Sequence, residues 1–251
     1  NQTPVTLMEK VKGICEEAFD EVLDKMNRNY ARFLEATHQP VHKLPWSRKV
    51  VDFMTLYEEA KAAGGEAFER EYRSELKTLQ QKLENNEMTL LDCNFTLLDF
   101  VYGYITDLSP RVVYGLIPPY YPNVSNRFIT GLAPQIRSLD VDLDRFTRER
   151  FGQHYVSEEF YTGISDLSYT SISNSEEISA ALSKSMPFYG TLYDIAISDI
   201  ETISMPCINI GPWGKDFHKL TERVLKQDLC ERTPAIIQHA IGLVLADGDR
   251  Q

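Results

Sequence analysis

The first hundred residues carry apolar side chains at every third or fourth position, which predicts a series of amphipathic helices. The longest apolar stripe begins at Leu7 and ends at Phe33, with charged residues on the opposite face. Thr3 and Pro4 precede it, and these residue types suit a helix cap and a first helical position. The pattern therefore predicts one opening helix of about eight turns.

Further helices are predicted before the first strand. Thr55 begins a second helix, which the glycine pair at residues 64–65 ends or kinks. A third, very polar helix is expected over residues 66–84. A fourth begins at Thr89, and Pro110 stops it.

The pattern changes after this helical region. Residues 112–117 are a short β-branched and aromatic run, which predicts a strand, and residues 205–210 predict a second one. Helical stretches are expected from about Ser125, over residues 175–183 and over residues 233–245. Short apolar strands separated by helices are typical of layered α/β proteins.

We therefore expect an α/β fold with a mainly parallel sheet flanked by helices and a largely helical N-terminal portion. Residues 1–108 would form the helical region, which packs on an α/β part at residues 109–251. Ligands in such folds bind beyond the carboxyl ends of the strands. The turn after residues 205–210 is therefore the first place to look for chemistry.

Composition and charge narrow the classes of partner. The 251 residues carry a net charge of -11, which argues against binding to nucleic acid or to anionic membranes. No apolar run approaches the roughly 18 residues of a transmembrane helix, and the opening residues predict no signal peptide. The four cysteines show no metal-binding spacing, so we expect buried thiols in a reducing cytoplasm. They are Cys15, Cys93, Cys207 and Cys230.

The turn after the second predicted strand holds the best candidate residues. Gly211 and Gly214 let the backbone turn tightly, and His218 follows at the start of a predicted helix. A neutral imidazole held in this way can bind a metal ion. Glu222 would lie one helical turn further on, on the same side as His218. A lone histidine is nevertheless more often structural than catalytic.

A second candidate segment contains Gly163, Ser165 and Asp166. Such a turn can offer backbone N–H groups and a carboxylate to a ligand, but it also suits an Asx turn or a helix cap. The histidines at 38 and 42 are expected in an exposed loop, because Pro40 between them opposes a helix. The sequence has no nucleophile elbow, phosphate-binding loop or dinucleotide fingerprint.

These segments carry a resemblance to a known superfamily. The pattern Gly-Pro-x-Gly-x-x-x-His-x-x-x-Glu within residues 205–224 resembles the last metal-ligand segment of the di-zinc aminoacylase and carboxypeptidase superfamily. Residues 163–166 resemble the Gly-Gly-Thr-Asp or Thr-Ser-Asp loop of the same zinc peptidases. Within the superfamily, residues 164–168, 208–216 and 218–224 are similar to the arginine-utilisation proteins of the RocB type.

The resemblance implies a role for each matching residue. His218 would be the final zinc ligand, and Glu222 would support it. The substrate loops would contain Gly163, Ser165, Asp166, Gly211 and Gly214. The superfamily's first ligand lies in a His-x-Asp motif, which this sequence lacks, and its general-base glutamate also comes from earlier in the chain. The resemblance therefore implies a C-terminal half, whose partner is the missing N-terminal half.

The expected function is that of the C-terminal part of a zinc-dependent peptidase or amidohydrolase. The resemblance implies two zinc ions in the intact protein and a small amide or dipeptide substrate in arginine or amino-acid catabolism. We expect the 251 residues alone to be inactive and to bind zinc weakly or not at all. One alternative is a non-catalytic interaction module that keeps the fold without metal. Another, an unrelated α/β hydrolase, is disfavoured because no nucleophile elbow is present.

Overall fold

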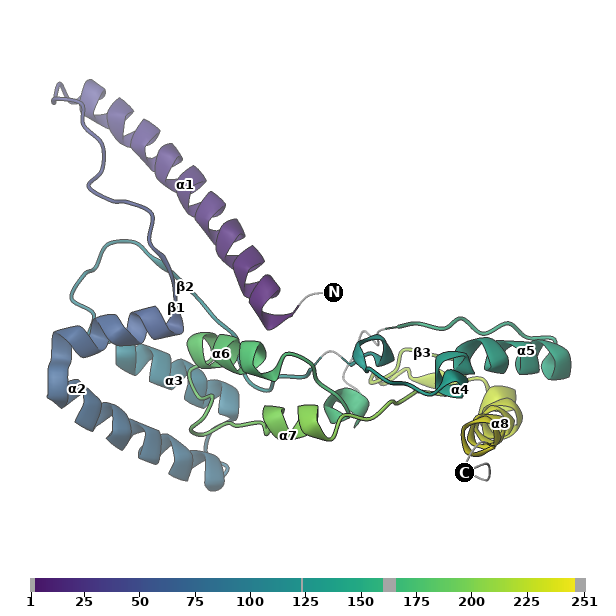
Figure 1. Ribbon diagram of the computed structural model, residues 1–251. Helices are drawn as coiled ribbons and strands as arrows, with labels where there is room; N and C mark the ends of the chain where they lie inside the picture. Colours follow the sequence, from purple (N-terminus) through teal and green to yellow (C-terminus); the bar gives the residue numbers. More distant parts are fainter. Residues whose placement is uncertain (1–2, 123, 160–165, 247–251) are drawn as a thin grey trace. The chain divides into compact units, whose positions relative to one another are not determined.

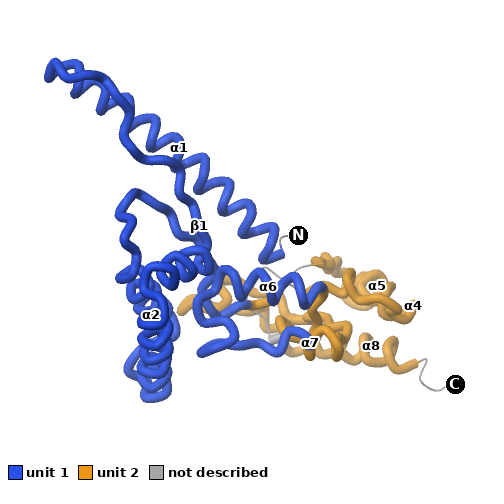
Figure 2. The backbone as a smooth tube through the Cα atoms, turned by 60° about the vertical axis from the view of Figure 1, so that its left-hand side comes forward, with its two compact units in different colours: residues 1–120, 174–198 blue, residues 121–173, 199–251 orange. Residues whose placement is uncertain are grey.

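The computed structural model describes residues 3–122, 124–159 and 166–246 (Figure 1). The chain forms two compact units, each built from two separate stretches of sequence (Figure 2). Unit 1 contains Asn1–Tyr120 and Asn174–Ser198, and unit 2 contains Tyr121–Ser173 and Asp199–Gln251. The boundary expected at residue 108 does not coincide with this division, because the chain leaves unit 1 only at residue 120 and later returns to it.

The opening helix of unit 1, α1, spans Pro4–Ala36, as its apolar stripe predicts. The hydroxyl oxygen of Thr3 accepts the backbone N–H of Thr6 at 3.2 Å, which satisfies one of the free donors at the helix start. Pro4 takes the first helical position, where its missing N–H costs no hydrogen bond. The expected cap and first residue are both confirmed.

The next two helices contain most of the unit 1 core. α2 spans Phe53–Glu84 and is kinked at Gly65, whose φ of 56° is accessible to glycine at little cost. α3 spans Leu90–Tyr102 behind the predicted cap Thr89. α2 begins two residues earlier than Thr55, because Asp52 caps it instead. The buried core on these helices includes Leu56, Ala60, Phe68, Leu79, Cys93, Leu97 and Val101.

A two-stranded parallel sheet joins distant parts of unit 1. β1 (Val50–Asp52) pairs with β2 (Val112–Tyr114), and Val51 lies opposite Val113. The strand predicted over residues 112–117 therefore ends three residues early. The chain then passes close to α6 (Ser175–Ser185), where a Cβ on Gly115 would lie 2.4 Å from the carbonyl oxygen of Ser185. Only glycine fits this crossing.

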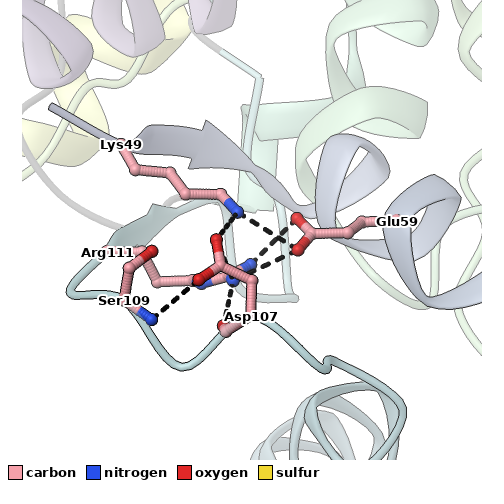
Figure 3. A network of polar contacts seen from close by, with 5 residues as sticks. All are labelled: Lys49, Glu59, Asp107, Ser109 and Arg111. Atoms are coloured by element: carbon pink, nitrogen blue, oxygen red, sulfur yellow. Dashed lines mark hydrogen bonds and ion pairs between the residues drawn. The ribbon is translucent and has the colours of Figure 1, made fainter. Parts of the chain in front are cut away.

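A network of ion pairs connects the residues just before β1 and β2 to α2 (Figure 3). Arg111, whose side chain is only 5% exposed, donates two hydrogen bonds to Glu59 at 2.9 and 3.1 Å. Lys49 bridges Glu59 at 3.1 Å and Asp107 at 2.8 Å. Burial alone would raise the pKa of Glu59, but the bonds from Arg111 and Lys49 outweigh it and lower that pKa. The network thus stays ionised at neutral pH.

Unit 2 consists of short helices around a smaller core. Its elements are η1 (Asn126–Phe128), α4 (Pro134–Arg137), α5 (Leu139–Phe151), η2 (Asp166–Tyr169), β3 (Gly214–Lys215), β4 (Arg223–Val224), the π-helical η3 (Asp228–Arg232) and α8 (Thr233–Leu245). α7 (Ile197–Thr202) spans the junction of the two units in the sequence. α5 packs on α8 through Leu139, Leu143, Ile236 and Ala240. The bounds predicted for α8 are confirmed.

The mainly parallel sheet expected from the sequence does not occur among the described residues. They contain two sheets of two strands each, and the second, β3–β4, is antiparallel. The strand predicted over residues 205–210 is wrong, since that segment pairs with no other strand. A larger sheet stays a prediction for a longer protein. Within the described ranges, no helix is long and apolar enough to cross a membrane.

Candidate functional site

A pocket of about 970 Å³ lies within unit 2. One part of its wall is formed by Cys207, Ile208, Asn209, Ile210 and Gly211, the segment predicted as a strand and the first residue of the glycine-rich turn. Leu167 and Ser168 of η2 also line it. Other lining residues come from η1, α4, α5 and α8. A volume of this size is typical of a small-molecule site.

The segment at residues 205–210 is held by side chains rather than by a neighbouring strand. The Asn126 amide donates to the carbonyl oxygen of Cys207 at 2.8 Å and accepts its N–H at 2.9 Å. The N–H of Met205 donates to the carbonyl oxygen of Thr170 at 3.0 Å. The Thr170 hydroxyl donates to the Cys207 sulfur at 3.1 Å. One asparagine thus takes the place of a strand partner and fixes this wall of the pocket.

The glycine-rich turn is anchored by the buried carboxylate of Asp228. This residue is 2% exposed, and it accepts the backbone N–H of Trp213 at 3.1 Å. It also accepts the Tyr155 hydroxyl at 3.4 Å and pairs with Arg232 at 2.8 Å. Tyr155 lines the pocket. Asp228 therefore fixes the turn and the pocket wall together.

His218 lies in the loop of a hairpin, and the helix predicted after it is absent. β3 pairs with β4 across residues 216–222, so Glu222 is a loop residue. The Glu222 carboxylate accepts the backbone N–H of His218 at 3.1 Å, and it thereby orients the main chain and not the imidazole. His218 has a left-handed backbone, with φ 62°, and both residues are exposed.

The two glycines of the turn differ in what they permit. A Cβ on Gly214 would lie 2.9 Å from the carbonyl oxygen of Arg223, so the close hairpin crossing requires glycine there. A Cβ on Gly211 would meet nothing within 4 Å. Gly211 lines the pocket, whereas Gly214 shapes the loop that carries His218.

The second candidate segment is described only in part. Gly163 and Ser165 lie outside the described residues, and of Asp166 the structure describes the backbone, which begins η2. Leu167 and Ser168, which follow Asp166 directly, line the same pocket as Gly211. The histidines at 38 and 42 are exposed loop residues, as predicted.

The described residues do not form a complete zinc site. A tight site uses about three or four protein ligands. No group of three or more histidine, cysteine, aspartate or glutamate side chains that could hold a metal ion occurs at residues 3–122, 124–159 and 166–246. His218 contributes one candidate ligand, and its backbone partner Glu222 does not complete a set.

A histidine–aspartate pair beside the pocket was missed by the sequence analysis. Asp144 on α5 lines the pocket and accepts a hydrogen bond from His154 Nδ1 at 2.7 Å. Arg148, one turn along α5, donates to the other carboxylate oxygen at 2.7 Å. The bonds from Arg148 and His154 lower the pKa of Asp144 to about 2. The i,i+4 spacing of Asp144 and Arg148 on a helix predicts their ion pair, whereas no local pattern indicates the contact with His154, which lies beyond the end of α5.

Comparisons with known proteins give distant relatives. No family model matches the chain, and no solved structure matches it significantly. Protein RocB of Bacillus subtilis is 23% identical over 238 residues, and the uncharacterized protein YqjN of the same organism is 25% identical over 240 residues. Each match covers 94% of this chain but only 41% of the relative. The chain is thus similar to less than half of each relative.

Proposed function

We propose that this chain is the C-terminal part of a zinc-dependent amidohydrolase or peptidase that acts on small amides or dipeptides in arginine or amino-acid catabolism. The similarity to RocB and YqjN supports a role within a longer protein. The single observation that carries the proposal is the pocket in unit 2, which is lined both by Gly211 of the turn and by the two residues directly after Asp166, while Gly214, His218 and Glu222 are not among its lining residues. Leu167 and Ser168 represent one segment, and Asn209 to Gly211 the other.

The role proposed for each residue follows from its place. Gly211 and Ser168 would contact substrate in the pocket, while Gly214 and Glu222 would hold the His218 loop in shape. His218 would be one zinc ligand of the longer protein, and the remaining ligands and the general base would come from residues outside these 251. On this proposal the 251-residue chain by itself hydrolyses no amide and binds zinc weakly.

The test compares two histidines in the full-length natural protein. His218→Asn removes the proposed ligand, since an amide is not among the usual zinc donors. His38→Asn is the matched control, because His38 is also an exposed histidine with a left-handed backbone, at φ 56°. Asparagine tolerates that backbone better than most residues, so neither change adds strain.

We expect His218→Asn to lower both bound zinc and the hydrolysis of dipeptides and N-acyl amino acids by at least tenfold. His38→Asn should retain both properties. Metal content by mass spectrometry and kcat/KM for a substrate panel are the measurements. Full activity and full zinc content in His218→Asn would contradict the proposed ligand. No hydrolysis and no zinc in the unchanged full-length protein would favour the alternative, a non-catalytic interaction module.

A further inference from the structure

The helix α1 presents an apolar stripe that nothing in the described part of the chain covers. Only Pro4, Met8 and Leu34 of its 33 residues are buried. The stripe consists of Ile14, Val22, Met26 and Phe33, which are 56%, 58%, 40% and 56% exposed, with the small Ala18 between the first two. A run of apolar side chains this long on one helix face is typical of an interaction surface.

The segment that follows α1 contacts a side of the helix next to the stripe, where the ring of Tyr30 meets His42 about 40–60° around the helix from Met26 and Phe33. Asn27 accepts the N–H of Leu44 at 2.9 Å, and Asp20 pairs with Arg48 at 3.2 Å. Helical geometry places both Asn27 and Asp20 about 140–160° around the helix from Val22. The returning chain therefore leaves the apolar stripe open, and Figures 1 and 2 show α1 projecting from the rest of unit 1.

The charged side chains beside the stripe are acidic along its first half and basic along its second half. Glu17 and Glu21 flank its first half, and Arg28 and Arg32 flank its second half on the same side. Across the described ranges, no ion pair involves any of these four residues. Like charges four residues apart on a helix repel each other. An isolated α1 therefore contains one acidic and one basic repulsive pair, beside the attractive spacings Glu21–Lys25 and Asp24–Arg28.

We propose that the apolar stripe of α1 binds the same stripe of a second copy of this chain in an antiparallel pair. With the two-fold axis between residues 24 and 25, Glu17 faces the second copy's Arg32 and Glu21 faces its Arg28. The acidic pair of each copy then lies beside the basic pair of the other copy, once on each side of the two-fold axis. In a parallel pair the same flank of the two copies would lie on opposite sides of the contact, so these charges would not meet.

The apolar residues fit the same alignment. Val22 lies within one residue of the position opposite Met26 of the second copy, and Phe33 lies at the level of Glu16, two residues from the small Ala18. Glu16 itself lies about 100° around the helix from Phe33, off the stripe. The stripe from Ile14 to Phe33 extends over about 30 Å of helix, so contacts repeat along several turns. This surface belongs to unit 1, and its proposed role is independent of the hydrolytic function proposed above.

The experiment uses two charge-reversal variants of the 251-residue chain. One is Glu17→Arg with Glu21→Arg, which makes all four of these flanking residues basic. The other is Arg28→Glu with Arg32→Glu, which makes all four acidic. The unchanged chain should sediment as a dimer at tens of micromolar. Each variant alone should be a monomer, with its helix content by circular dichroism retained. An equimolar mixture of the two should form dimers again.

The apolar contact has its own matched pair of variants. Val22→Asp should abolish the dimer, whereas Leu108→Asp should not, because Leu108 is a 91% exposed loop residue that is not part of α1. If the unchanged chain stays monomeric up to about 200 µM, the proposal is overturned, and the stripe binds a different partner. A dimer that survives in Val22→Asp or in the two charge-reversal variants would overturn it as well.

Discussion

The buried carboxylate of Asp228 accepts the backbone N–H of Trp213 at 3.1 Å and so connects the π-helical start of α8 to the glycine-rich turn. The other carboxylate oxygen pairs with Arg232, whose side chain is 14% exposed. This one residue supports the turn, the pocket wall and a buried cation. The candidate site therefore depends on a residue that would contact no substrate.

Removing the charge of Asp228 should destabilise unit 2. Asp228→Asn leaves the guanidinium of Arg232 buried without its counter-charge, and breaking a buried pair in this way costs about 3 kcal/mol or more. The measurement is urea denaturation followed by tryptophan fluorescence. The control is Asp216→Asn, which breaks the exposed pair with Arg223 in the adjacent hairpin. That change should cost less than about 1 kcal/mol, and equal effects of the two variants would contradict the anchoring role of Asp228.

The ion-pair network of unit 1 should make the protein sensitive to acid. Hydrogen bonds from Lys49 and Ser109 lower the pKa of Asp107. The pKa of Glu59 is lowered as well. A carboxylate whose pKa is lower in the folded protein than in the unfolded chain stabilises the fold at pH values above the unfolded pKa, which is about 4.3 for glutamate. This stabilisation is lost as the pH falls through the pKa of the folded state. The free energy of unfolding should therefore be steady from about pH 5 upward and fall below about pH 4.5.

A variant isolates the contribution of Glu59 to this acid sensitivity. Glu59→Gln should lower stability at pH 7 and reduce the loss between pH 5 and pH 3, since one of the titrating carboxylates is gone. Glu58→Gln is the control, because Glu58 is an exposed neighbour on the same helix. Urea denaturation at several pH values gives both quantities. An unchanged pH profile in Glu59→Gln would show that the network does not set the acid response.

The two glycines of the turn should respond differently to alanine. In Gly214→Ala the new methyl group meets the carbonyl oxygen of Arg223 at 2.9 Å, so the hairpin must open. Hydrogen exchange at the Leu225 amide, which bonds to the Trp213 carbonyl at 2.8 Å, should accelerate by at least tenfold. Gly211→Ala has open space and should leave that rate unchanged. Equal exchange rates in the two variants would contradict the described crossing.

Asn126 should be required for the shape of the pocket. Asn126→Asp keeps an acceptor for the Cys207 N–H but loses the donor to its carbonyl oxygen. The lost bond and the unsatisfied, half-buried carbonyl should cost about 1 kcal/mol. Denaturation and amide exchange at Cys207 are the measurements.

The helices could be predicted because their signals are local. Thr3 and Thr89 cap helices whose apolar stripes follow directly, and α8 begins and ends at the predicted residues. Each signal lies within a few residues of the element that it defines. The kink at Gly65 is of the same kind, since one glycine conformation determines it.

The strands and the site could be predicted only in part, because their partners are far away in the sequence. The segment at residues 205–210 reads as a strand, but its backbone is bonded to Asn126, 81 residues earlier. The helix expected after His218 gives way to a hairpin, whose strands pair Gly214 with Val224. Neither periodicity nor a local motif could reveal these contacts.

The parallel pairing of β1 with β2 has a consequence for the order of folding. The paired residues Val50 and Val112 enclose the whole of α2 and α3 between them, together with most of the core of unit 1. Joining such distant residues is slow, since the loop-closure entropy must be overcome before the contact forms. We therefore expect the α2–α3 hairpin to form first and the two strands to close over it late, so that Val113→Ala accelerates unfolding while the folding rate stays nearly constant.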